Sequence, residues 1–293
     1  MRVRSRRLAF LIIVATGALG TEIAGQAFDG PAGRFSVNGR EMALHCSSGP
    51  PPTLVIDAAL GDSSEDWESI ARDLSTQAAV CIYDRAGYGE SDPSPLPRSP
   101  TTNARDLRTL LNVAGLQPPF VIIGHSFGGL NAQAFWHQFP ADVAGMILLD
   151  PTPTPSLIQG RFPGVWDLVV SEGAGLQAQA AQAKRDSTPE ATRLEAMASE
   201  HREMLLWGEG AAGLDSFGDL PLLVVAAGRP NQDYLGDSAI AFQQFWIDEN
   251  RSLASRSTVG RVEILESVGH AMAYEAPSVI LDLIRGFLGK LST

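Results

Sequence analysis

The sequence predicts a three-layer α/β fold built on a mostly parallel sheet. Three observations lead to this fold class: short apolar runs alternate with helix-like stretches, turn residues separate them, and the alternation continues almost to the C-terminus. Strands that are buried on both faces of a parallel sheet read as continuous apolar runs, and helices cover both faces. The 293 residues suit one large domain of this class or two small ones.

Residues 1–27 are expected to be a signal peptide and not part of the fold. Four arginines precede a 12-residue apolar run, residues 8–19, and small residues follow. The run is shorter than the roughly 20 residues that a membrane-spanning helix needs. Cleavage is expected after Ala27, with Gly20 as an earlier alternative. We therefore expect export to a periplasm or the cell exterior, with no stable membrane span after processing; a retained anchor is the weaker alternative.

The charge balance excludes some classes of function. The chain carries 22 Lys+Arg against 33 Asp+Glu, a net charge of −11. Removal of residues 1–27 leaves 18 against 32, or −14. Nucleic acid is not expected as a partner, because phosphate binding needs a basic face. With 44% hydrophobic and 19% charged residues, the chain is neither disordered nor a multi-span membrane protein.

The first elements along the chain are expected to be a hairpin, two strands and two helices. The Asn38-Gly39 pair is a strong hairpin signal between strands 34–37 and 42–46. A buried strand follows the three prolines at 50–52, and Gly115 ends the second helix. The expected elements are strand 53–57, helix 65–75, strand 80–84 and helix 101–114.

The second half of the chain continues the alternation but contains one long interruption. Apolar strands are expected at 120–124, 144–149, 222–227 and 261–265, with helices starting near Phe127, Ala239 and Pro277. About residues 151–219 contain no strand and are rich in Ala, Gln and Glu. We expect this segment to be a helical insertion, so that residues 28–293 form one domain.

The two cysteines lie in expected strands, Cys46 in the second and Cys81 in the fourth. In an oxidising compartment they could form a disulfide, and the alternative is two buried free thiols. Neither cysteine has partners at the spacing of a metal site, apart from His45 beside Cys46. No metal or cofactor is expected.

The segment Gly124-His-Ser-Phe-Gly128 matches the G-x-S-x-G nucleophile elbow. In this motif a serine sits on a strained turn between a strand and a helix, so that the residues two positions away on either side must be small. The hydroxyl then lies at the helix N-terminus, which favours developing negative charge. We therefore expect Ser126 to be a nucleophile.

A serine hydroxyl needs a base, and elimination among five histidines selects His270. His125 adjoins the serine with its side chain expected to point away, while His45, His137 and His201 lie in a strand or in helices. His270 follows the last strand, which places it at the carboxyl edge of the sheet, where Ser126 also lies.

These features resemble the α/β-hydrolase fold superfamily, which combines the elbow, a histidine after the last strand, and the chain order serine, acid, histidine. The segment Tyr83-Asp-Arg-Ala-Gly-Tyr-Gly-Glu-Ser-Asp92 is similar to a loop of the esterase, epoxide-hydrolase and aminopeptidase-like branch. The resemblance implies that the helical insertion is a cap over the active site. A serine at position 126 argues against the branches that use an aspartate nucleophile.

The resemblance also implies an oxyanion hole made by two backbone N–H groups, from Phe127 and from the loop after strand 53–57. The match to the family pattern makes Leu60 the second donor, and ordinary packing is the alternative role for Leu60.

Asp84 and Arg85 are expected to hold their loop by an ion pair. Four of the five tryptophans are expected to pack in the core or the cap, with a pocket lining as the alternative role of the two in the cap, Trp166 and Trp207; the other two are Trp67 and Trp246.

The acid that orients the histidine has two candidates. The position that the family most often uses falls on Asn231, which cannot carry the charge, and Asp233 follows two residues later. Asp150 directly ends the strand before the insertion, a position that some family members use for the acid. A turn-forming aspartate before proline is the alternative role for Asp150. We favour Asp150 over Asp233.

Hydrolysis of a small or medium carboxylic ester through an acyl-serine is the expected activity. The alternatives are amide or peptide hydrolysis of the aminopeptidase-like type and ligand binding without catalysis. An aminopeptidase would need a carboxylate in the cap to bind an amino terminus, and the candidates are Glu195, Glu200 and Glu203. The expected partner is a small-molecule ester or amide, and the sequence does not determine the oligomeric state.

Overall fold

The computed structural model describes residues 28–153, 155–207 and 215–291. The expected signal peptide and part of the expected insertion lie outside these residues. The described strands are β1 Ala32–Val37, β2 Arg40–Cys46, β3 Thr53–Asp57, β4 Val80–Tyr83, β5 Phe120–His125, β6 Val143–Leu149, β7 Leu222–Ala227 and β8 Arg261–Leu265. The α-helices are α1 Glu68–Leu74, α2 Pro100–Val113, α3 Phe127–Gln138, α4 Pro155–Arg161, α5 Pro163–Arg185, α6 Ala191–Leu205, α7 Gln232–Leu235, α8 Ala239–Ser255, α9 Met272–Glu275 and α10 Pro277–Leu291. Short 3₁₀ helices are η1 Ser64–Trp67, η2 Pro140–Asp142 and η3 Gly236–Ser238.

The eight strands form one sheet in the order β1-β2-β4-β3-β5-β6-β7-β8. β1 pairs with β2 and β2 with β4 in antiparallel register, while the strands from β4 to β8 in this order are parallel. The residues of β5 and β7 are buried throughout, as expected for strands covered on both faces. The predicted three-layer α/β class is confirmed.

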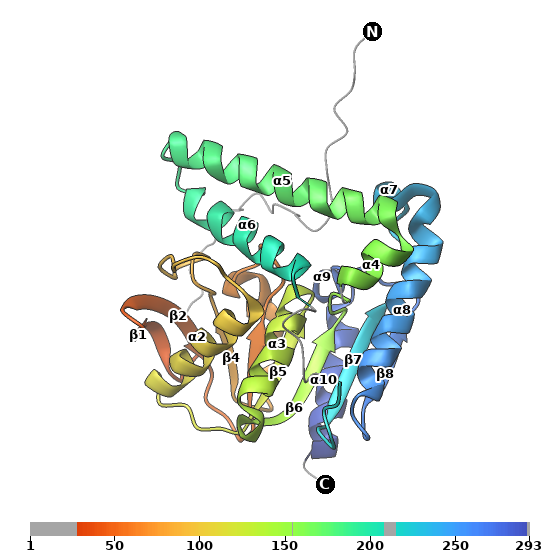
Figure 1. Ribbon diagram of the computed structural model, residues 1–293. Helices are drawn as coiled ribbons and strands as arrows, with labels where there is room; N and C mark the ends of the chain where they lie inside the picture. The colour runs from red at the N-terminus through yellow and green to blue at the C-terminus, as the bar shows by residue number, and fades with distance from the viewer. Residues whose placement is uncertain (1–27, 154, 208–214, 292–293) are drawn as a thin grey trace.

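Each face of the sheet has its own apolar core. Side chains of α1 and α10 pack on one face, with Ile70 and Ile284 among them. Side chains of α2, α3 and α8 pack on the other, with Leu110, Leu130 and Phe242 among them. The helices α4, α5 and α6 come between β6 and β7 in the chain and lie above the carboxyl ends of the parallel strands (Figure 1). Ser126 follows β5 and His270 follows β8, so the predicted nucleophile and base both lie at this edge of the sheet, beneath these helices.

Local sequence explains the boundaries of several elements. Ser99 caps α2, because its hydroxyl accepts a hydrogen bond from the Thr102 N–H at 3.2 Å, and Pro100 follows at the first helical position. Gly115 ends the same helix with a positive φ of 79°.

Cys46 and Cys81 are register partners in β2 and β4 and are joined by a disulfide. Among the described residues, no helix combines the length and the apolar character that crossing a bilayer requires.

Candidate active site

The elbow is a strained turn between β5 and α3. Ser126 has φ 53° and ψ −117°, a conformation that a non-glycine residue rarely adopts. A Cβ atom on Gly124 would lie 2.4 Å from the carbonyl oxygen of Gly128. A Cβ on Gly128 would lie 2.1 Å from that of Asp57. The glycines at both positions therefore allow the strand, the turn and the helix to approach closely enough to present the Ser126 hydroxyl.

His270 and Asp150 continue from this hydroxyl as an unbroken chain of hydrogen bonds. The Oγ atom of Ser126 lies 2.9 Å from Nε2 of His270, and Nδ1 of His270 lies 2.6 Å from Oδ2 of Asp150. An ionised carboxylate only accepts hydrogen bonds, so Nδ1 carries the proton and Nε2 is free to accept one from the serine. The arrangement is that of a nucleophile, a base and an orienting acid.

Asp150 is held in place by a dense set of backbone and side-chain contacts. It follows β6 with a positive φ of 42°, and its N–H donates to the carbonyl of Val225. Its second oxygen, Oδ1, accepts from the N–H of Ala227 at 2.9 Å and from the indole of Trp246 at 2.8 Å. The side chain is buried. Asp233 is exposed on α7, so of the two candidate acids Asp150 is the one that contacts His270.

Trp246 lies beside the proposed triad, a role that the sequence did not indicate. Its ring lies 5.8 Å from the imidazole of His270 at 87°, an edge-on arrangement, and its N–H binds Asp150. The residue belongs to α8, 96 positions after Asp150. Its apolar neighbours on that helix resemble an ordinary core face, so no local pattern marks it.

His125 holds the backbone of His270 by a hydrogen bond. Its Nε2–H donates to the carbonyl oxygen of His270 at 2.9 Å, and its ring packs edge-on against Trp67. Burial, followed by the nearby charge of His270, lowers the pKa of His125 to about 4. The imidazole is therefore neutral at pH 7, and it fixes the loop from which His270 projects.

The two predicted oxyanion donors come from segments that touch. A Cβ atom on Gly128 would collide with the carbonyl oxygens of Asp57 and Ala58. The first turn of α3 therefore packs directly on the loop that leads to Leu60. Within the described part of the chain, neither the Phe127 N–H nor the Leu60 N–H donates to another protein group. Both side chains are buried. The two donors thus remain available to a ligand oxygen.

Asp62 adds an acidic group with a perturbed pKa next to this loop. Its N–H closes a turn onto the carbonyl of Ala59 at 3.2 Å. Burial, and secondarily the charge of Asp66, raises the pKa of Asp62 to about 6, although Arg85 and His270 act in the opposite direction. A carboxyl group with a raised pKa binds its proton more tightly in the folded chain than in the unfolded one. The fold therefore loses stability as pH rises from about 4 to about 6.

Replacing Asp62 by Asn is expected to remove this loss. The melting temperature of Asp62→Asn should equal that of the wild type at pH 4 and exceed it at pH 7.5. The gain should be roughly 2–4 °C, the shift that about 1 kcal/mol produces in a chain of this size. Thermal unfolding followed by circular dichroism at both pH values measures it, with the exposed Asp233→Asn as control. A gain of the same size at both pH values would contradict the assignment.

The expected ion pair between Asp84 and Arg85 is wrong. Asp84 instead accepts hydrogen bonds from the backbone N–H groups of Ser64 at 2.7 Å and Glu90 at 2.9 Å. Gly89 passes so close that a Cβ there would lie 2.1 Å from the Asp84 carboxylate. Asp84 thus ties the start of η1 to the loop after β4, and the Arg85 side chain extends elsewhere to contact Asp57 and Glu200.

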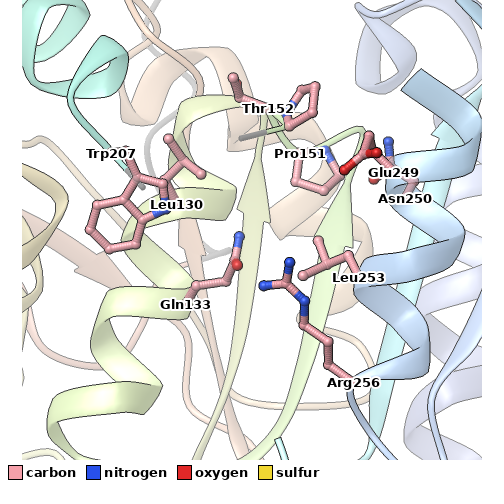
Figure 2. A pocket seen from close by; sticks show the side chains of 10 residues that line it. Leu130, Gln133, Pro151, Thr152, Trp207, Glu249, Asn250, Leu253 and Arg256 are labelled. Atoms are coloured by element: carbon pink, nitrogen blue, oxygen red, sulfur yellow. The ribbon is translucent and has the colours of Figure 1, made fainter. Parts of the chain in front are cut away.

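A pocket borders the proposed triad without including it. It opens between α3, the loop after β6, and α8, and Figure 2 shows Pro151, Trp207 and Arg256 around it. Pro151 follows Asp150 directly, but Ser126, Asp150 and His270 are not among the lining residues. The proposed triad lies at the carboxyl edge of the sheet, beneath α4, α5 and α6, and is separate from the residues that line this pocket.

The comparisons with known proteins agree with this architecture. A family model described as alpha/beta hydrolase fold matches residues 52–278. The uncharacterized protein YqjL of Bacillus subtilis (strain 168) is 34% identical over 99 residues, which are 34% of this chain and 39% of that protein. The chain spans less than half the length of the first curated relatives that it matches.

Two solved structures show the same fold at low identity. A thermophilic esterase from Thermogutta terrifontis is 20% identical with a TM-score of 0.64, covering 89% of this chain and 100% of that one. The enol-lactonase from Burkholderia xenovorans LB400 is 18% identical with a TM-score of 0.63, covering 88% and 100%. At these identities the likeness establishes the fold alone. Because the family model spans more than half of the sequence, the chain belongs to the alpha/beta hydrolase fold family.

Proposed function

We propose that this protein is a serine hydrolase that cleaves carboxylic esters through an acyl-serine intermediate. The observation that carries the proposal is the hydrogen-bonded chain from the Oγ atom of Ser126 through the ring of His270 to the carboxylate of Asp150. Three side chains that follow three different strands meet in the order that nucleophilic catalysis requires. A ligand-binding protein without catalysis would have no need of this alignment.

The geometry supports a two-step reaction. In the first step Oγ of Ser126 attacks the ester carbonyl while Nε2 of His270 takes the hydroxyl proton. The N–H groups of Phe127 and Leu60 stabilise the negative oxygen of the tetrahedral intermediate, and Asp150 stabilises the imidazolium. As the intermediate collapses, His270 returns the proton to the departing alcohol. In the second step a water molecule, deprotonated by His270, attacks the acyl-serine. As this second intermediate collapses, the bond to Oγ of Ser126 breaks, His270 returns its proton to Oγ, and the acid leaves.

Contacts in the cap favour ester over peptide substrates. An aminopeptidase-like enzyme needs a free carboxylate for the amino terminus, and each of the three predicted candidates already has a cationic partner. Glu195 pairs with Lys184 at 2.7 Å, and Glu203 pairs with Arg202 at 3.4 Å. Glu200 is fully buried against Arg85. An ester substrate needs no such group, so we prefer ester hydrolysis to the amide alternative.

A fluorophosphonate probe and two series of chromogenic substrates test the proposal. The probe should label the native protein, and peptide mapping should locate the adduct on Ser126, with heat-denatured protein as the control. p-Nitrophenyl esters should give a burst of nitrophenol followed by steady turnover, and aminoacyl-p-nitroanilides should react more slowly. Absence of labelling would refute both hydrolase functions, and faster turnover of the anilides would overturn the preference for esters.

A further inference from the structure

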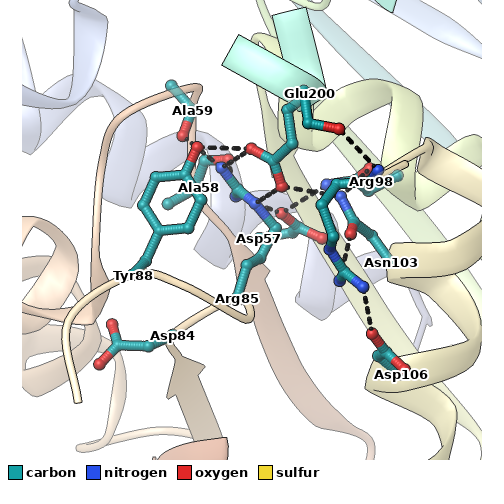
Figure 3. A network of polar contacts seen from close by, with 12 residues as sticks. Asp57, Ala58, Ala59, Asp84, Arg85, Tyr88, Arg98, Asn103, Asp106 and Glu200 are labelled. Atoms are coloured by element: carbon teal, nitrogen blue, oxygen red, sulfur yellow. Dashed lines mark hydrogen bonds and ion pairs between the residues drawn. The ribbon is translucent and has the colours of Figure 1, made fainter. Parts of the chain in front are cut away.

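A fully buried polar network connects the cap to the loop that carries the oxyanion donor Leu60. Its centre is Arg85, whose side chain lies between β3, the loop after β3 and the cap helix α6 (Figure 3). Glu200 projects from α6 with no exposed surface. Burying an ion costs several kcal/mol unless it is fully paired, and apolar side chains could fill the same space without this cost. The buried charges therefore point to a role beyond packing.

Every donor of the Arg85 guanidinium has an acceptor. Nε and Nη2 donate to the two oxygens of Glu200, at 2.9 Å and 3.2 Å. Nη1 donates to Asp57 at 2.9 Å and to the carbonyl oxygen of Ala58 at 2.7 Å. The last donor, on Nη2, binds the carbonyl oxygen of Ala59 at 2.8 Å. All five N–H groups are used, so the planar group can occupy only one orientation.

The bond to Ala59 bears directly on the oxyanion hole. The carbonyl of Ala59 and the N–H of Leu60 belong to one planar trans peptide, so they point in opposite directions. When Arg85 holds the carbonyl, the N–H of Leu60 has to point away from Arg85. A carbonyl that binds a cation also polarises its peptide unit, and this strengthens the N–H as a donor. The guanidinium of Arg85 also lies 5.4 Å from the ring of Phe127, the residue whose backbone N–H is the other proposed oxyanion donor.

Glu200 in turn fixes Arg85 from the cap. Besides the two bonds to the guanidinium, its carboxylate accepts from the Tyr88 hydroxyl at 2.6 Å and from the Asn103 amide at 2.9 Å. Burial alone would lower the pKa of Arg85, but the charges of Glu200 and Asp57 raise it, so the guanidinium remains cationic. Glu200 thus accepts four hydrogen bonds, and its loss would leave Nε and one N–H of Nη2 of Arg85 without an acceptor.

We infer that Arg85 and Glu200 are positioning residues for the reaction, which orient the Leu60 N–H toward the negative oxygen of the tetrahedral intermediate. Neither side chain is required to contact the substrate. Since Glu200 belongs to α6, the cap completes the oxyanion hole in addition to covering the site. This inference rests on the proposed ester hydrolysis.

The test compares Glu200→Gln with the wild type, using p-nitrophenyl butyrate as the substrate and an alkyl trifluoromethyl ketone as the inhibitor. The ketone forms a tetrahedral adduct with the serine, and the negative oxygen of that adduct occupies the oxyanion hole. Removal of one oxyanion donor lowers kcat by roughly 10²–10³-fold, so a misdirected donor should lower it by about 10- to 100-fold. The inhibition constant of the ketone should rise by the same factor, while KM stays within about twofold.

Two further variants separate positioning from folding. Asp106→Asn breaks a buried ion pair with Arg98 nearby and leaves the contacts of Arg85 intact, so it should lower the melting temperature without changing ketone affinity. Tyr88→Phe removes a single hydroxyl from Glu200 and should give the same parallel change at about two- to tenfold. This second variant decides the question where Glu200→Gln does not fold.

The outcomes distinguish this inference from the proposed function. If the wild type neither hydrolyses the ester nor binds the ketone, both fail. If the wild type is active but Glu200→Gln and Tyr88→Phe retain its kcat and ketone affinity, only the positioning role of Arg85 and Glu200 is refuted. An equal loss of ketone affinity in Asp106→Asn would show a general loss of structure and would also refute it.

Discussion

Replacing Ser126 by Ala is expected to lower kcat for ester hydrolysis by about 10⁶-fold, the size of effect that loss of a triad nucleophile produces. The variant retains His270, Asp150 and the proposed oxyanion donors but has no atom that can form the acyl bond. Substrate binding should persist, because the alanine removes only one oxygen from the site. A residual rate above that in buffer should remain, since the oxyanion hole and binding act without the nucleophile.

Stopped and continuous assays with p-nitrophenyl butyrate measure this loss, together with disappearance of fluorophosphonate labelling. Ser187→Ala is the matched control, because Ser187 has nearly the same positive φ, 54° against 53°, but lies exposed in the cap. The control should retain wild-type kcat and labelling. A Ser126→Ala enzyme within about tenfold of the wild-type rate would show that the reaction does not use this hydroxyl.

Much of the sheet could be predicted from the sequence, because its strands are apolar and end at turn residues. The structure places β3, β7 and β8 at the predicted bounds, and the elbow follows β5 as the motif indicates. The order of the strands could not be obtained in this way. That order depends on pairing between segments far apart in the chain, and one apolar run fits beside another almost equally well.

The candidate nucleophile and base are readable for a different reason. Ser126 is marked by the small residues that its own turn demands, and His270 by its place after the last strand. The acid lacks such a local signal, because Asp150 and Asp233 both follow strands that end at the same edge of the sheet. Only the direction of each side chain separates them, and that direction depends on backbone contacts such as the one from Asp150 to Val225.

The supporting residues are the least predictable part of the site. Glu200 meets Arg85 across 115 positions of sequence, and on its helix it reads like one of several solvated acidic residues. The error about Asp84 and Arg85 has the same origin. Adjacent opposite charges suggest a local ion pair, whereas the fold offers backbone N–H groups to Asp84 and two buried carboxylates to Arg85.

The contacts of Asp150 also predict what happens when its charge is removed. Oδ1 accepts from the N–H of Ala227 and from the indole of Trp246, so in Asp150→Asn the single carbonyl oxygen should take this position. The amide NH₂ group then replaces Oδ2, which lies 2.6 Å from Nδ1 of His270. Two donors cannot face each other, so Nδ1 has to become an acceptor and the proton moves to Nε2. In that tautomer His270 cannot accept the proton of Ser126.

We therefore expect Asp150→Asn to lower kcat for p-nitrophenyl butyrate by about 10⁴-fold, with KM nearly unchanged, since the geometry is kept and only the tautomer is wrong. Asp233→Asn is the control and should keep the wild-type rate, because Asp233 is exposed on α7 and lies outside the hydrogen-bonded chain. Rates are measured near neutral pH on protein whose melting temperature has been checked for both variants. If Asp233→Asn abolishes turnover while Asp150→Asn leaves it intact, the acid has been assigned to the wrong strand end. The hydrogen bond between Asp150 and His270 would then have no part in the reaction.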